Sequence, residues 1–165
     1  MNVMMAVLAA SVVALATGTE GAPPAAPSRL PDFELTTLDG GATRTAAAVP
    51  GQGKWLIVYV QPNCAPCDAL LGLIKRDEHP DLPARMVIID GGASAVSAGE
   101  ARRQFAELSD ARWYADTTGV GWTALDMSGA PMVFGMNDGM IQWRLSGMNP
   151  PKADVKSILA SWVRE

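Results

Sequence analysis

The 165 residues are enough for one domain with its own hydrophobic core and too few for two ordinary domains. Apolar residues make up 48% and charged residues 18%, a globular rather than a disordered composition. The formal net charge of −4, with no basic block, argues against nucleic acid as the main partner.

Residues 1–20 resemble a secretory signal. The stretch Val3–Ala16 is apolar, the first 19 residues carry no charged side chain, and small residues follow the apolar run. No Lys or Arg precedes that run, so an uncleaved membrane anchor is the alternative, although about 17–25 residues are needed to span a bilayer. We therefore expect export to the periplasm, with this segment cleaved or anchored in the inner membrane.

Residues 21–30 are rich in Pro and Ala and predict an extended linker. The folded domain is then expected over residues 31–165, and it opens with alternating apolar residues on either side of an Asp39–Gly41 turn. That pattern predicts a β-hairpin.

The rest of the domain alternates between buried strands and amphipathic helices. The expected fold class is α/β, with a central mixed sheet flanked by helices. Predicted strands cover 54–60, 84–90, 112–116, 130–136 and 140–147, and predicted helices cover 65–77, 97–110, 119–127 and 152–165.

The two cysteines, Cys64 and Cys67, stand three residues apart where a strand gives way to a helix. A zinc site needs four ligands, and the chain adds only His79. Copper(I) accepts thiolates and thioethers, but no methionine stands beside the cysteines. A structural disulfide across so short a loop would restrict the unfolded chain little.

The strand-to-helix setting favours a redox role. In the first turn of a helix, the unpaired backbone N–H groups and the helix dipole stabilise a thiolate, which makes Cys64 the expected nucleophile. Cys67, one turn further on, is placed to resolve a mixed disulfide. Pro66 loses no hydrogen bond so early in a helix.

The motifs "KWLIVYVQPNCAPC", "PDFELTTLDGG" and "GAPMVFGMNDGMIQWRLSG" together resemble the thioredoxin superfamily, most closely its exported TlpA/ResA-type thiol–disulfide oxidoreductases. The resemblance covers nearly the whole domain. It implies a thioredoxin-like fold with an N-terminal β-hairpin extension, and a cis bond at Pro131 facing the cysteines. It also implies catalysis by Cys64, Cys67 and Pro131 without a cofactor or bound metal. The expected contacts with a client protein surround these residues and are Asn63, Ala65, Pro66 and Ala130.

Three positions depart from the family pattern. Asn63 stands where the family usually has Trp, and Val58 and Leu70 stand where members carry a buried acid. The buried proton acceptor for the second cysteine is therefore expected to be missing. Nothing in the sequence places the remaining candidate acids near the sulfur, namely Asp68, Asp116 and Asp126.

The residues between the cysteines supply no charge and no side-chain donor, which favours a reducing centre. The predicted function is reduction of disulfides in client proteins, with electrons from a membrane-bound or periplasmic donor. The alternative is a copper metallochaperone or assembly factor of the same fold that binds its cargo without turnover.

Overall fold

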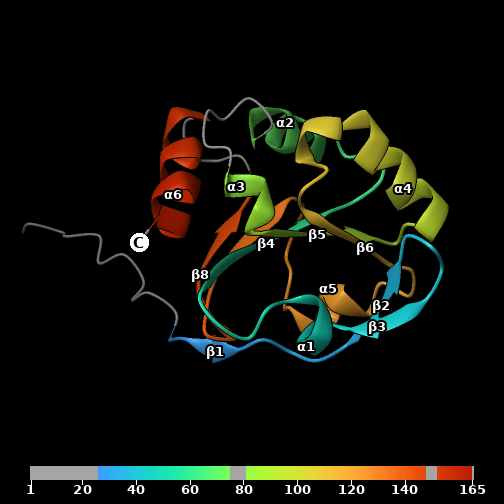
Figure 1. The fold of residues 1–165 in the computed structure, drawn as a ribbon, viewed down its shortest axis with the longest axis horizontal. Coiled ribbons are helices and arrows are strands. Elements are labelled where there is room, and N and C mark those ends of the chain that lie inside the picture. Colours follow the sequence, from blue (N-terminus) through green and yellow to red (C-terminus); the bar gives the residue numbers. More distant parts are fainter. Residues whose placement is uncertain (1–25, 75–80, 148–151, 165) are drawn as a thin grey trace, which may run out of the picture.

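The computed structural model of the chain describes residues 26–74, 81–147 and 152–164. In this part of the chain, eight strands form one sheet in the order β1-β8-β7-β4-β5-β6-β2-β3, with helices on both faces (Figure 1). The predicted signal or anchor, residues 1–20, and His79 lie outside the described residues. Among the residues that are described, no helix combines the length and hydropathy of a membrane span.

The centre of the sheet is mixed, as the sequence predicts. Strands β4 (Lys54–Val60), β5 (Met86–Gly91) and β6 (Arg112–Asp116) run parallel. Strand β7 (Met132–Asn137) pairs antiparallel with β4, and β8 (Met140–Ser146) pairs antiparallel with β7. The carboxyl ends of β4, β5 and β6 therefore meet at one edge, where α/β proteins usually place their sites.

The predicted N-terminal hairpin forms and extends the sheet beyond β6. Strands β2 (Glu34–Thr37) and β3 (Ala42–Arg44) are joined by a turn in which Gly40 has φ 89°, a left-handed conformation that glycine adopts at no steric cost. At the other edge, β1 (Ser28–Arg29) pairs with β8. These two residues belong to the segment predicted as a linker, residues 21–30. The strand was not predicted because pairing with a distant strand leaves no local sequence pattern.

The helices cover the two faces of the sheet unequally (Figure 1). Helices α2, α3, α4 and α6 pack on one face, while α1 and α5 lie on the other. Their bounds, with one 3₁₀ turn, are α1 Thr45–Ala48, α2 Ala65–Ile74, α3 Asp81–Ala84, α4 Ala95–Gln104, η1 Ala106–Leu108, α5 Val120–Ala124 and α6 Lys152–Arg164. Alternate residues of each strand point to opposite faces of the sheet and pack into two hydrophobic cores. Val58 and Ile88 belong to one core, and Ile57 and Ile89 belong to the other.

Helix α4 begins two residues before the predicted start at residue 97. The hydroxyl of Ser94 accepts a hydrogen bond from the Ser97 amide at 3.1 Å and caps the helix. The helix ends at Gln104 rather than continuing to residue 110, and η1 follows. The four-residue helices α1 and α3 were not predicted, because one turn is too short to show a helical period in the sequence.

Candidate active site

The segment between β4 and α2, residues 61–64, forms the rim of the candidate site, and we call it the redox loop. Gln61, Pro62 and Asn63 are exposed on it. Asn63 has φ 56°, in the left-handed region that Asn tolerates better than most side chains. The rim next to the cysteines is therefore polar, and its backbone conformation suits the residue found there.

The two cysteines form a disulfide at the start of α2, with their Cα atoms 5.2 Å apart. The Cys64 carbonyl accepts the first helical hydrogen bonds, from the amides of Cys67 at 2.8 Å and Asp68 at 3.1 Å. The Cys67 amide also lies 3.3 Å from Sγ of Cys64, as a donor. Cys64 is half-buried, whereas Cys67 is only 1% exposed. The accessible sulfur is thus the one at the positive end of the helix dipole.

The loop before β7 faces this sulfur. The peptide bond between Ala130 and Pro131 is cis, and the Ala130 carbonyl oxygen lies 3.9 Å from Sγ of Cys64. Pro131 is buried, and its carbonyl accepts a hydrogen bond from the Gly147 amide at 2.8 Å, just after β8. The fold therefore brings Ala130 and Pro131 to the cysteines across 66 residues of sequence.

The remaining predicted contact residues lie on the surface around the disulfide. Ala65 and Pro66 are exposed in the first turn of α2, and Asn63 is exposed on the redox loop. All three are available to a docking protein.

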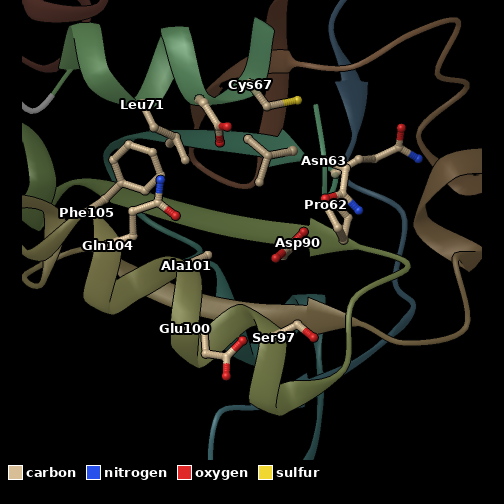
Figure 2. A pocket seen from close by; sticks show the side chains of 13 residues that line it. Pro62, Asn63, Cys67, Leu71, Asp90, Ser97, Glu100, Ala101, Gln104 and Phe105 are labelled. Atoms are coloured by element: carbon tan, nitrogen blue, oxygen red, sulfur yellow. The ribbon is translucent and has the colours of Figure 1, made fainter. Parts of the chain in front are cut away.

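The structure corrects the prediction that the site lacks a buried acid. Val58 and Leu70 are indeed apolar and buried, but Asp90, at the end of β5, is only 4% exposed. It pairs in register with Val60 and lines the same cleft as Cys67 (Figure 2). The sequence carries a signal for it, because an aspartate that ends a buried parallel strand lies at the same sheet edge as the redox loop.

The carboxyl of Asp90 has an unfavourable environment. Its Oδ1 is buried without a hydrogen-bond partner among the described residues. Burial, and secondarily the charge of Asp68, raises the pKa of Asp90 from 3.8 to about 6. The carboxyl is therefore mostly ionised at pH 7 and has no compensating charge among its described neighbours in the cleft.

The other two aspartates left unplaced by the sequence lie elsewhere. Asp116 is fully buried at the end of β6, where it accepts a hydrogen bond from the Tyr59 hydroxyl at 2.9 Å. Asp126 is exposed and lies 4.0 Å from Arg144. Burial, followed by the hydrogen bond to Asp116, raises the pKa of Tyr59 well above its usual range. The described residues contain no group of three or more His, Cys, Asp or Glu side chains placed to hold a metal ion.

No protein-family model matches the sequence, and no curated protein matches it either. Solved structures do match. A thiol:disulfide interchange protein of the thioredoxin family from Chlorobium tepidum TLS superposes with a TM-score of 0.54 at 18% identity, covering 86% of this chain and 99% of that one. A thiol:disulfide interchange protein from Bacteroides sp. gives 0.64 at 11% identity, covering 86% and 92%.

A secreted Mycobacterium tuberculosis disulfide oxidoreductase homologous to E. coli DsbE gives a TM-score of 0.57 at 16% identity, covering 78% of this chain and 95% of that one. At these identities the likeness concerns the fold. The chain has a thioredoxin-like fold, and the disulfide lies at the carboxyl edge of its parallel strands.

Proposed function

We propose that the protein is a thiol–disulfide oxidoreductase that reduces disulfides of client proteins in the periplasm. The observation that carries the proposal is the Cys64–Cys67 pair, with Cys64 half-buried at a helix N-terminus and Cys67 buried. That asymmetry fits one attacking and one resolving thiol. Support for a client-binding role of Ala130 and Pro131 comes from the 3.9 Å separation between the Ala130 carbonyl oxygen and the Cys64 sulfur.

The reaction begins with the reduced protein. The Cys64 thiolate attacks one sulfur of a client disulfide, so a mixed disulfide forms and the second client sulfur leaves as a thiolate. The Cys67 thiolate then attacks Sγ of Cys64, and the first client sulfur leaves. The client gains two electrons and takes two protons from solvent. The protein loses two electrons and ends as the Cys64–Cys67 disulfide.

The Cys67 amide favours Cys64 as the attacking group. At 3.3 Å from Sγ it is placed to stabilise a negative sulfur, which the helix dipole also favours. A membrane-bound or periplasmic dithiol donor would return the two electrons. Delivery to that compartment is the role we propose for residues 1–20, and residues from 21 to the start of β1 would separate the domain from a retained anchor.

The direct test is insulin reduction, with the reduced full chain compared with Cys64→Ser and Cys67→Ser variants. Without its attacking sulfur, Cys64→Ser should fall to the uncatalysed rate. Cys67→Ser should accumulate a mixed disulfide that dithiothreitol releases and mass spectrometry detects. Equilibration with glutathione would measure the potential, and a value near that of strong oxidases would contradict the reductase direction.

Copper(I) titration separates the alternative function. The full chain and the Cys64→Ser variant are titrated in parallel, so that binding through the cysteines is distinguished from binding through methionine sulfurs. Stoichiometric, cysteine-dependent binding of Cu(I) together with no insulin reduction would overturn the proposal in favour of a metallochaperone.

A further inference from the structure

A cleft of about 360 Å³ opens between α2 and α4, above the ends of β4 and β5 (Figure 2). Cys67 lines it, and Pro62 and Asn63 of the redox loop form one wall. Three carboxylates, those of Asp68, Asp90 and Glu100, belong to its lining, which includes no described Lys, Arg or His. The cleft is therefore an acidic hollow directly beside the disulfide.

Asp90 is the residue in this cleft whose environment indicates a missing ligand. Figure 2 shows its carboxyl inside the cleft, between the helix that carries Cys67 and the helix that carries Ser97. The residue is only 4% exposed, and its Oδ1 has no partner among the described residues. A buried carboxylate oxygen without a partner is costly, and the nearby charge of Asp68 adds to that cost.

The guanidinium of Arg103, which pairs with the third carboxylate, does little to offset this negative charge. Glu100 lies 4.0 Å from the guanidinium of Arg103, but the two side chains are 66% and 74% exposed. Such a surface pair is weak and leaves the acidic character of the cleft largely intact. A cation entering from outside would meet two carboxylates with little competition.

The shape and lining of the cleft indicate which kind of cation fits it. Gln61, Asn63 and Gln104 bring amide groups, while Leu71 and Phe105 supply apolar wall. Lys and Arg side chains combine an apolar stem with a charged head, which suits such a surface. The volume is at the lower end of the roughly 300–1,000 Å³ of small-molecule pockets, which fits one side chain.

We propose that this cleft binds a lysine or arginine side chain of the client, close in sequence to the cysteine that joins Cys64. The inference rests on the proposed function and adds its substrate preference. A client held through Cys64 places its neighbouring residues against the redox loop, which is also a wall of the cleft. The cation then pairs with Asp90 and Asp68, and the preferred clients carry a positive charge near their disulfide.

The test uses symmetric peptide dimers joined by one disulfide, so that either sulfur gives the same products. A self-quenching fluorophore reports reduction by an excess of the reduced full chain. Lys, norleucine or Glu is placed in turn at each of the three positions on either side of Cys. At one or more positions, the Lys peptide should react about tenfold faster than norleucine, with Glu slowest, as expected for a charge-assisted hydrogen bond.

The rate ratio of Lys to norleucine is then measured in Asp90→Asn, which removes the charge at nearly constant size. Asp68→Asn is the second variant, since an exposed residue can be changed with little risk to folding. Both ratios should approach one. Asp110→Asn is the matched control, because this exposed carboxyl lies before β6, at the opposite edge of the sheet, and the ratio should stay at its original value.

Three results would overturn the inference. One is a Lys-to-norleucine ratio of one at every position in the unmodified protein. A second is an Asp90→Asn protein that slows every peptide while keeping the original ratio, which would assign Asp90 to proton transfer with Cys67. The third is no reduction of any peptide or of insulin, in which case the proposed function itself fails and the preference falls with it.

Discussion

Two buried aspartates end neighbouring parallel strands, and their surroundings differ. Asp90 is the last residue but one of β5, and Asp116 is the last residue of β6. The register pairs Asp90 with Ala115 and Asp116 with Gly91, so the two carboxyls stand one residue out of step and point to opposite faces of the sheet. One faces the α2–α4 cleft, and the other faces α5.

Both carboxyl oxygens of Asp116 accept hydrogen bonds within the fold. Its Oδ2 accepts hydrogen bonds from the Tyr59 hydroxyl at 2.9 Å and the Gly121 amide at 2.8 Å, and its Oδ1 accepts one from Thr118 at 3.3 Å. Asp90 has an oxygen with no partner in the described part of the chain. The comparison indicates that Asp116 stabilises the protein, whereas Asp90 costs stability and is better explained by binding.

Among these changes, Asp116→Ala should destabilise the protein most. The change leaves the Tyr59 hydroxyl and the Gly121 amide buried without an acceptor, so the free energy of unfolding should fall by about 4 kcal/mol. Urea denaturation measures it. Asp116→Asn is the control and should lose much less, because the amide keeps one acceptor oxygen. A loss below about 1 kcal/mol for Asp116→Ala would remove the contrast with Asp90.

The next effect is the pH dependence caused by Asp90. Its pKa is about 6 in the folded protein and 3.8 when unperturbed, so the folded state binds more protons between these values. The contribution of Asp90 to the free energy of unfolding is therefore fully present below about pH 4 and is lost as the pH rises through 6. The loss by pH 7 should approach about 3 kcal/mol, at about 1.4 kcal/mol per pKa unit.

Asp90→Asn should remove this part of the pH dependence. Denaturation at about pH 4 and pH 7 gives the loss for each protein, and the difference between the two losses isolates Asp90 from the other groups that titrate there. Equal losses in the two proteins would mean that Asp90 ionises in the fold as it does in the unfolded chain.

The smallest effect is expected from Tyr59→Phe. The hydroxyl donates to Asp116, but the carboxyl keeps its bonds to Gly121 and Thr118, so the free energy of unfolding should fall by only about 1 kcal/mol. Thermal and urea denaturation measure it. A loss as large as that of Asp116→Ala would show that the Tyr59 hydrogen bond alone accounts for the stabilising role of Asp116.

Local pattern was enough to predict most of the elements and the centre of the site. Continuous apolar runs predicted β4 and β5, the Asp39–Gly41 turn predicted the β2–β3 hairpin, and the strand-to-helix change placed Cys64 at a helix start. These features depend on residues a few positions apart. Short elements such as α1 and β1 were not predicted, because their ends are set by contacts with distant strands.

The order of residues along the chain is enough to place two cysteines at the start of a helix that follows a buried strand. What surrounds the cysteines depends on how distant segments come together in the fold. The fold placed the Ala130 carbonyl 3.9 Å from Cys64, and it turned Asp90 into the cleft beside Cys67 while Asp116 faced the other way. The register of the strands explains this: a shift of one residue between β5 and β6 decides which carboxyl meets Tyr59 and which keeps an oxygen without a partner among the described residues.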